Sequence, residues 1–292
     1  IGMRPKMQEE LQELLGGNKG LVLLSAMPAS GLRSTTTVVL RAMDRLVRDF
    51  TSVEDVQNRY EEVENVKLMT YDSAAGETPV TILRKVFLEE PEVVIVRDLV
   101  NGEVVGDICE EISSVGRLVL STVRAKDAAE ALLRVLAMKV PAAEFSESVI
   151  AVLNQRLVRK LCEHCREAYM PPPQVLQQLG IPPGRVDAFY RPPQQPEEVC
   201  EVCSGIGYIG RTAIFELLRV DDTVRNALVS TPKLDVVRQA ARQAAYYEAN
   251  KEEIKARRRT GKRADAGKPR DPGPRPGSPF HVFACKVKPC AT

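Results

Sequence analysis

The sequence has no tryptophan, only two histidines, and only seven phenylalanines and seven tyrosines in 292 residues. Its formal net charge is only +2, because 39 Asp and Glu residues nearly balance 41 Lys and Arg residues. Proteins that bind nucleic acid combine a basic surface with aromatic side chains on which bases stack. We therefore expect no nucleic-acid partner, and a zinc-ribbon nucleic-acid-binding protein remains only a third alternative for the function.

Long apolar runs are absent as well. No run approaches the roughly 20 residues that a membrane-spanning helix needs. The first residues, Ile1-Gly2-Met3-Arg4, have no apolar stretch behind them, so we expect no signal peptide and a cytoplasmic protein. A chain that begins on Ile1 also suggests a fragment of a longer protein.

Short continuous apolar runs alternate with amphipathic stretches along the chain. The runs at 21–24, 93–96 and 118–123 predict strands that are covered on both faces. Apolar residues recur at the spacing of an amphipathic helix in seven stretches, which predicts helices at 4–16, 38–50, 79–89, 103–114, 126–139, 144–161 and 211–249. This alternation predicts an α/β fold with a mostly parallel sheet.

Four of the seven cysteines form two Cys-x-x-Cys pairs: Cys162, Cys165, Cys200 and Cys203. Without an export signal, such pairs favour metal binding over disulfides. Four sulfur ligands form the tetrahedral site that structural zinc prefers, with no open position for chemistry. We expect a structural zinc ion here, with His164 as a bystander; four free buried thiols are the alternative.

The loop at 27–35 lies between a predicted strand and a predicted helix, where a phosphate-binding loop would lie. It reads Met-Pro-Ala-Ser-Gly-Leu-Arg-Ser-Thr. In the pattern G-x-x-x-x-G-K-[ST], glycines let backbone amides surround the phosphates, Lys contacts the β/γ oxygens and a hydroxyl binds Mg²⁺. Here Met27 and Leu32 replace both glycines and Arg33 replaces Lys, so only the hydroxyl of Ser34 is kept.

The stretches around this loop resemble the GspE/PilB/PilT-like ATPases of type II secretion and type IV pilus assembly. The segments that resemble family signatures are 155–162 (QRLVRKLC) and 205–218 (GIGYIGRTAIFELL), and the likeness extends from about residue 4 to 230. The resemblance implies a RecA-like P-loop NTPase domain with a small zinc-binding insertion, built on the four cysteines, and C-terminal helices. It assigns ATP and Mg²⁺ contacts to these residues of the loop: Ser30, Gly31, Arg33, Ser34 and Thr35.

The resemblance also indicates catalytic candidates, and most of them depart from the family pattern. Glu54 keeps its place in Ser-Val-Glu-Asp, and Arg84 matches the first arginine of L-R-x-x-L-R-x-D-P. Asp98 stands where the family's V-G-E-I-R-D has glutamate, a carboxylate shorter by about 1.5 Å. A misplacement of that size can cost on the order of 10²-fold in rate. An ordinary surface Arg-Asp pair at a strand end is an equally good interpretation of Arg97 and Asp98.

The histidine box of the family is changed too. Its two histidines correspond to Arg117 and Arg124, which stay charged and cannot shuttle protons. Together the departures predict retained folding with weak or lost ATP binding and hydrolysis. The alternative is a catalytically competent motor of the same machine.

The resemblance implies assembly as a homo- or hetero-hexamer with secretion or pilus proteins at the inner membrane, where the chain would be peripheral. We divide the chain into four parts: an ATPase core at 1–161, a zinc-binding module at 162–210, a helical region at 211–250 and a tail at 251–292. The tail is basic and rich in Pro and Gly, which predicts disorder. Contact of this tail with anionic lipid is the alternative.

Overall fold

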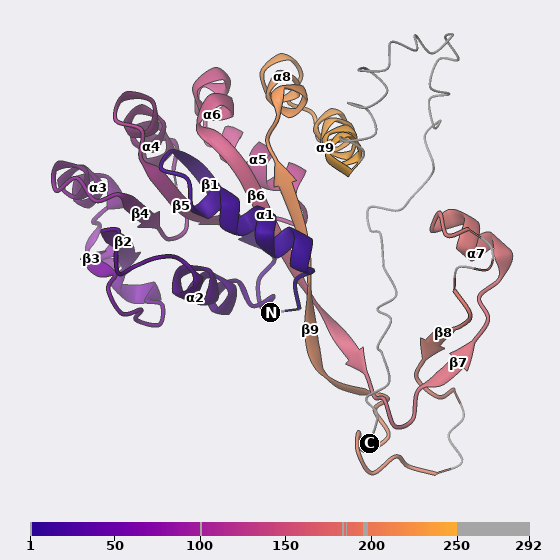
Figure 1. Ribbon diagram of the computed structural model, residues 1–292. Coiled ribbons are helices and arrows are strands. Elements are labelled where there is room, and N and C mark those ends of the chain that lie inside the picture. The colour runs from indigo at the N-terminus through magenta and orange to yellow at the C-terminus, as the bar shows by residue number, and fades with distance from the viewer. Residues whose placement is uncertain (1, 100, 183, 185, 195–197, 250–292) are drawn as a thin grey trace, which may run out of the picture. The chain divides into compact units, whose positions relative to one another are not determined.

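The computed structural model describes residues 2–99, 101–182, 184, 186–194 and 198–249 (Figure 1). The predicted tail at 251–292, with Cys285 and Cys290, lies outside these residues. The described chain divides into two compact units. The first contains residues up to 158 together with 213–249, and the second contains 159–212.

The first unit is built on a seven-stranded sheet in the order β3-β2-β4-β5-β1-β6-β9. The strands are β1 (Gly20–Ala26), β2 (Phe50–Asp55), β3 (Lys67–Tyr71), β4 (Val93–Val96), β5 (Leu118–Val123), β6 (Val149–Leu161) and β9 (Tyr208–Arg219). Strand β1 pairs in parallel with β5 and β6, and β2 pairs in parallel with β3 and β4. Strands β4 and β5 are also parallel, which confirms the predicted fold class.

Helices cover both faces of this sheet (Figure 1). On one face, α1 (Pro5–Leu15) and α2 (Leu32–Ala42) pack onto apolar side chains that include Val22 and Leu24 of β1. The helices on the other face are α3 (Pro79–Leu88), α4 (Gly102–Ser114), α5 (Ala128–Leu136), α6 (Ala142–Ser148), α8 (Asp222–Ser230) and α9 (Leu234–Ala249). Every residue of β1 is buried, as expected of a parallel strand with helices above and below it.

Two helix predictions are wrong, and a third, 38–50, holds only as far as Ala42, where α2 ends; Phe50 begins β2. The stretch 144–161 forms only the short helix α6 before it continues as β6, and 211–249 begins as strand β9. In the first stretch the continuous apolar run at 149–153 suggests a helix, although a buried strand and a buried helix share that pattern. The β-branched residues Val149, Ile150 and Val152 favour the strand, where β6 pairs with β1. The strands β2 and β3 were also not predicted.

The second unit contains a two-stranded antiparallel sheet of β7 (Glu167–Tyr169) and β8 (Phe189–Arg191), with α7 (Pro173–Gln178) between them. The rings of Tyr169 and Phe189 lie edge to face, with centroids 6.2 Å apart. In the described part of the chain, no helix has the length and apolar character needed to cross a bilayer.

Phe145 on α6 is fully buried in the core on the α3–α9 face of the sheet. We expect Phe145→Ala to lower the free energy of unfolding by about 3–5 kcal/mol, because it removes apolar contacts and leaves a cavity. The exposed Leu46 supplies the control, since Leu46→Ala should change stability by less than about 0.5 kcal/mol. Urea denaturation of both variants measures the difference, and equal midpoints would contradict this account of the core.

Candidate nucleotide site and cysteine cluster

The predicted phosphate loop connects β1 to α2, the position that the sequence indicated. Gly31 is the N-cap of α2 and has a φ of 79°, a left-handed conformation that favours glycine. Ala29 also has a positive φ, of 59°. No side chain caps α2, so its first-turn amides have no side-chain acceptor at the N-cap. The loop therefore keeps the strand–loop–helix form of an anion site while its glycines are displaced.

Gln155 on β6 forms hydrogen bonds with two residues of this loop, Ser30 and Thr35. Its Nε2 donates to the carbonyl oxygen of Ser30 over 2.6 Å, and its Oε1 accepts from the hydroxyl of Thr35. A Cβ atom added at Gly31 would lie 3.0 Å from the same Nε2. Gln155 thus fixes the loop and engages the Thr35 hydroxyl, whereas Ser34 is exposed.

The carboxylate of Glu54 lies at the end of β2, and its oxygen atoms are already in use. Oε1 forms an ion pair with Nε of Arg97 over 3.2 Å and accepts from Ser52 Oγ over 2.8 Å. Oε2 accepts from the backbone amide of Tyr60 over 3.0 Å. The side chains of Glu54 and Arg97 are only 5% and 3% exposed. A guanidinium group therefore balances the charge of the carboxylate for which the family resemblance predicts a catalytic role.

Asp98 follows β4 and is engaged by neutral donors. Its carboxylate accepts from Asn58 Nδ2 over 2.8 Å and from Thr122 Oγ1 over 3.2 Å. The amide of Asp98 donates to the same hydroxyl over 2.8 Å, and its φ is 60°. Asn58 in turn accepts from Arg33 of the loop, so a chain of hydrogen bonds connects the loop to Asp98.

Tyr60 lies against both arginines. The guanidinium carbon is 4.2 Å from the ring centroid for Arg97 and 5.1 Å for Arg33, within the range of cation–π attraction. Burial, followed by the charge of Asp98, raises the pKa of Tyr60. Burial also lowers the pKa of Arg97, while Glu54 opposes this effect. One Arg97 nitrogen, Nη1, is buried without a hydrogen-bond partner among the described residues.

A cavity of about 470 Å³ lies beside this network, at the carboxyl ends of β2, β4 and β5. Asp55, Asn58, Asp98, Thr122 and Arg124 contribute to its lining. Clefts at the carboxyl ends of parallel strands are the usual ligand sites of open α/β sheets.

Arg84 lies elsewhere in the first unit. On α3 it bonds to Asp107 over 2.9 Å and to Glu103 over 3.3 Å, both on α4. Among the described residues these two partners do not include Glu54 or Asp98, so the catalytic role of Arg84 stays a prediction. Arg117 of the histidine-box stretch is buried and pairs with Glu111 over 2.6 Å, which makes it part of the packing. Arg124 is exposed.

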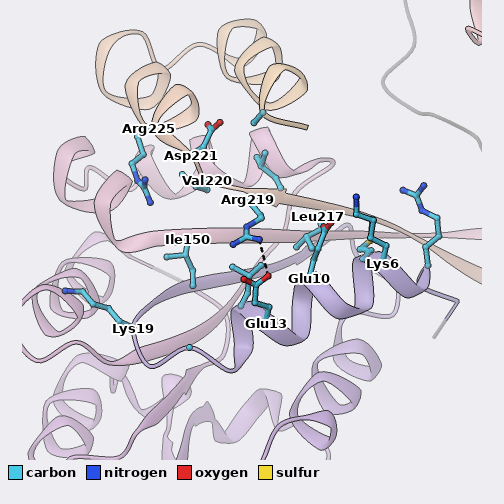
Figure 2. A pocket seen from close by; sticks show the side chains of 16 residues that line it. Lys6, Glu10, Glu13, Lys19, Ile150, Leu217, Arg219, Val220, Asp221 and Arg225 are labelled. Carbon is cyan, nitrogen blue, oxygen red and sulfur yellow. Dashed lines mark hydrogen bonds and ion pairs between the residues drawn. The ribbon is translucent and has the colours of Figure 1, made fainter. Parts of the chain in front are cut away.

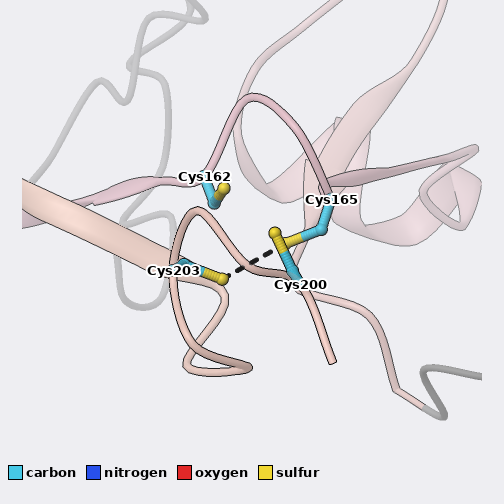
Figure 3. A group of neighbouring side chains, drawn as sticks. All are labelled: Cys162, Cys165, Cys200 and Cys203. Carbon is cyan, nitrogen blue, oxygen red and sulfur yellow. Dashed lines mark hydrogen bonds between the residues drawn. The ribbon is translucent and has the colours of Figure 1, made fainter. Parts of the chain in front are cut away.

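In the second unit the four predicted cysteines converge from two turns (Figure 3). The sulfur atoms of Cys162, Cys165, Cys200 and Cys203 all lie within 4.8 Å of one another. Cys165 and Cys203 are separated by 3.6 Å, and the amide of Gly207 donates to Cys203 over 3.2 Å. Partial burial, and then hydrogen bonds with the other three thiols, raise the pKa of Cys165 to about 12. Such crowded thiols ionise together only with a cation among them, so the donor set fits zinc.

The comparison with known families settles the relationship. A family model described as "Type II/IV secretion system protein" matches residues 1–265. The chain belongs to this family. It is 31% identical over 244 residues to the type IV pilus assembly ATPase PilB of Thermus thermophilus, covering 83% of this chain and 26% of that protein. It is 33% identical over 228 residues to the type II secretion system protein E of Klebsiella pneumoniae, covering 78% of this chain and 44% of that protein.

Solved structures confirm the fold. The pilus retraction motor PilT with bound ADP superposes with a TM-score of 0.51 at 15% identity, covering 86% of this chain and 58% of that one. The ATPase DotB of Yersinia pseudotuberculosis gives 0.53 at 12% identity, with 87% and 58% covered. The chain spans between about a quarter and half of the length of the two sequence relatives.

Sequence reasoning missed several members of the network around the loop. Asn58 and Tyr60 lie in a stretch with no motif, so nothing in the sequence indicated them. Thr122 and Gln155 do lie in stretches that carry the family resemblance, but their contacts join segments more than twenty residues apart. Only a tertiary structure pairs such segments.

The buried Glu54–Arg97 pair predicts an asymmetric response to mutation. We expect Glu54→Leu to lower the free energy of unfolding by about 3–5 kcal/mol, because it leaves the Arg97 charge buried without its anion. The double variant Glu54→Leu/Arg97→Met should recover most of that loss, since apolar replacements of a buried pair are often neutral. Denaturant unfolding of four proteins, the unmodified chain, Glu54→Leu, Arg97→Met and the double variant, measures the coupling. Losses that simply add would show that the two side chains do not interact.

Proposed function

We propose that this protein is a secretion/pilus ATPase-family subunit whose own ATP binding and hydrolysis are weak or lost. It would act in the assembly of a type II secretion or type IV pilus machine, as a structural or regulatory member of a homo- or hetero-hexamer. We infer the kind of machine from the names of two relatives. One is a type IV pilus assembly ATPase and the other a type II secretion system protein. The proposed place is the cytoplasmic side of the inner membrane.

The proposal that ATP binding and hydrolysis are weak or lost rests on the buried ion pair between Arg97 and Glu54. A divalent cation at the phosphates of a nucleotide needs oxygen ligands that are free to bind it. Glu54 gives its oxygens to Arg97, Ser52 and the amide of Tyr60, and Asp98 accepts from Asn58 and Thr122. Metal binding would have to break these bonds and bring a second cation close to the Arg97 guanidinium.

The loop supports the same conclusion. The planar guanidinium group of Arg33 does not replace the compact charge of a lysine ammonium group. Here it donates a hydrogen bond to Asn58 and lies near the ring of Tyr60. Leu32 packs against the apolar core below α2, at a position where the family loop has a glycine. Phosphate contacts by Ser30, Gly31, Ser34 and Thr35 remain part of the competing proposal, a competent ATP-hydrolysing motor.

A titration with ATP, with and without Mg²⁺, separates these two proposals. We expect no saturable Mg²⁺-dependent binding and no turnover above a blank, and we expect Asp98→Asn to change neither result. Asp222→Asn, which alters an exposed carboxylate on α8, serves as the matched control. Tight Mg²⁺-ATP binding with turnover that collapses in Asp98→Asn but persists in Asp222→Asn would establish the motor instead.

We also propose that Cys162, Cys165, Cys200 and Cys203 hold one structural zinc ion. Their sulfur atoms provide a closed four-ligand set, so the ion would stabilise the turns of the second unit and take no part in chemistry.

Metal analysis of the purified protein tests this assignment. We expect about one zinc ion per chain, a strong loss in Cys203→Ser, and no loss in Cys109→Ala, which alters a buried cysteine outside the cluster. A zinc content well below one per chain in the unmodified protein would refute the site.

A further inference from the structure

The two Cys-x-x-Cys turns of the second unit differ in the side chains that they carry. The first turn, at 162–165, has Glu and His between its cysteines. The second turn, at 200–203, has Val202 between its cysteines, with Val199 before them and Ile206 after them. A site of four thiolates binds its metal through sulfur alone, so it requires none of these apolar side chains.

The cysteines of the second turn point into the sulfur cluster (Figure 3), whereas its apolar side chains are exposed. Val199 is 72% exposed, Val202 57% and Ile206 66%. We call these three side chains the apolar turn. Single exposed apolar residues are ordinary on a protein surface, but a group of them with a polar rim marks an interaction site.

Backbone hydrogen bonds hold the apolar turn in one shape. The amide of Gly205 donates to the carbonyl oxygen of Cys200 over 3.2 Å, and the amide of Ile206 donates to that of Cys203 over 3.1 Å. A Cβ atom added at Gly205 would lie 3.4 Å from Cγ1 of Val199, so this valine packs against the backbone of the turn. A surface that is already fixed loses little conformational entropy when a partner binds.

The charges beside the apolar turn have one sign. Residues 198–206 include Glu198 and Glu201 and contain no Lys, Arg or His. Both glutamates are exposed, and neither side chain forms an ion pair or a hydrogen bond with another residue that the structure describes. In the first turn, by contrast, Glu163 pairs with Lys160 over 3.1 Å. The second turn therefore combines apolar side chains with uncompensated negative charge.

The groove of about 650 Å³ beside α1 in the first unit is different in this respect (Figure 2). Its lining carries both signs of charge, because Arg219 pairs with Glu13 over 3.3 Å and Lys6 and Glu10 lie nearby. Such a lining favours no partner of one sign, whereas the second turn does.

We propose that the apolar turn, together with Glu198 and Glu201, binds a protein segment in which Lys or Arg flank large apolar side chains. The apolar contacts would form the centre of the interface and the glutamates part of its charged rim. The source of the segment rests on the proposed function. At the inner membrane, the cytoplasmic segments of membrane proteins carry an excess of Lys and Arg, so a membrane protein of the machine would supply this chemistry.

Two other occupants fit these charges less well. Anionic lipid would be repelled by the two unpaired glutamates. A second copy of the chain, packed symmetrically, would bring the same glutamates of both copies into one interface. A basic protein segment avoids both repulsions.

Fluorescence anisotropy with labelled synthetic peptides tests the proposal on the full chain. One peptide has Leu at the spacing of an amphipathic helix and Lys at the other positions, and a matched peptide has Glu in place of Lys. We expect the Leu/Lys peptide to bind saturably and the Leu/Glu peptide to bind about tenfold more weakly, because the glutamates of the turn repel it.

Variants of the turn locate the binding. Ile206→Ser should weaken binding of the Leu/Lys peptide about tenfold, because it removes an apolar contact. Glu201→Gln should weaken it about threefold, since an exposed ion pair contributes less. Met170→Ser is the matched control and should keep the affinity, because Met170 is also 66% exposed but lies outside the turn. Metal content and unfolding midpoint should be the same in all these proteins.

Four results would overturn the proposal. One is the lack of saturable binding, and another is equal affinity in the unmodified chain, Ile206→Ser and Glu201→Gln. Sedimentation with phosphatidylglycerol vesicles that is lost in Ile206→Ser would assign the turn to the membrane. Self-association that is lost in the same variant would assign it to a second copy. The ATP titration involves none of these residues, so failure of this proposal and failure of the proposed function can be told apart.

Discussion

The parallel sheet of the first unit depends on one constraint, which is that both of its faces must be covered. Strand β1 is fully buried, and its neighbours β5 and β6 extend the same two apolar faces. Helices α1 and α2 cover one face and six further helices cover the other. Because these strands are parallel, the carboxyl ends of β2, β4, β5 and β1 lie along one edge of the sheet, which is where the loop, Glu54 and Asp98 are found.

At that edge a guanidinium group balances the charge of Glu54, and neutral donors engage Asp98. The side chain of Arg97 is almost fully buried and lies on Glu54, and Arg33 is connected to Asp98 through Asn58. Because a guanidinium group is part of the chain, it occupies its place permanently, whereas a metal ion exchanges with solvent. The family fold is thus retained while the oxygens of the site are engaged within the protein.

The two units are stabilised by different means. The first has large apolar cores, so the loss of one core side chain costs a few kcal/mol. The second has short strands and a cluster of four sulfurs, and small units of this kind commonly depend on a metal for stability.

The sequence by itself determined the family, the cysteine cluster, the loop position and the strands at 93–96 and 118–123, because local patterns and spacing carry these features. It did not separate strand from helix within 144–161 and 211–249; in the first of these a continuous apolar run fits both. Only the tertiary structure brought Gln155 to the loop and Asn58 to Asp98, and only it replaced the ambiguous surface pair Arg97–Asp98 with a buried contact between Arg97 and Glu54. These contacts join segments far apart in the chain, and their energies depend on burial, which no local pattern records.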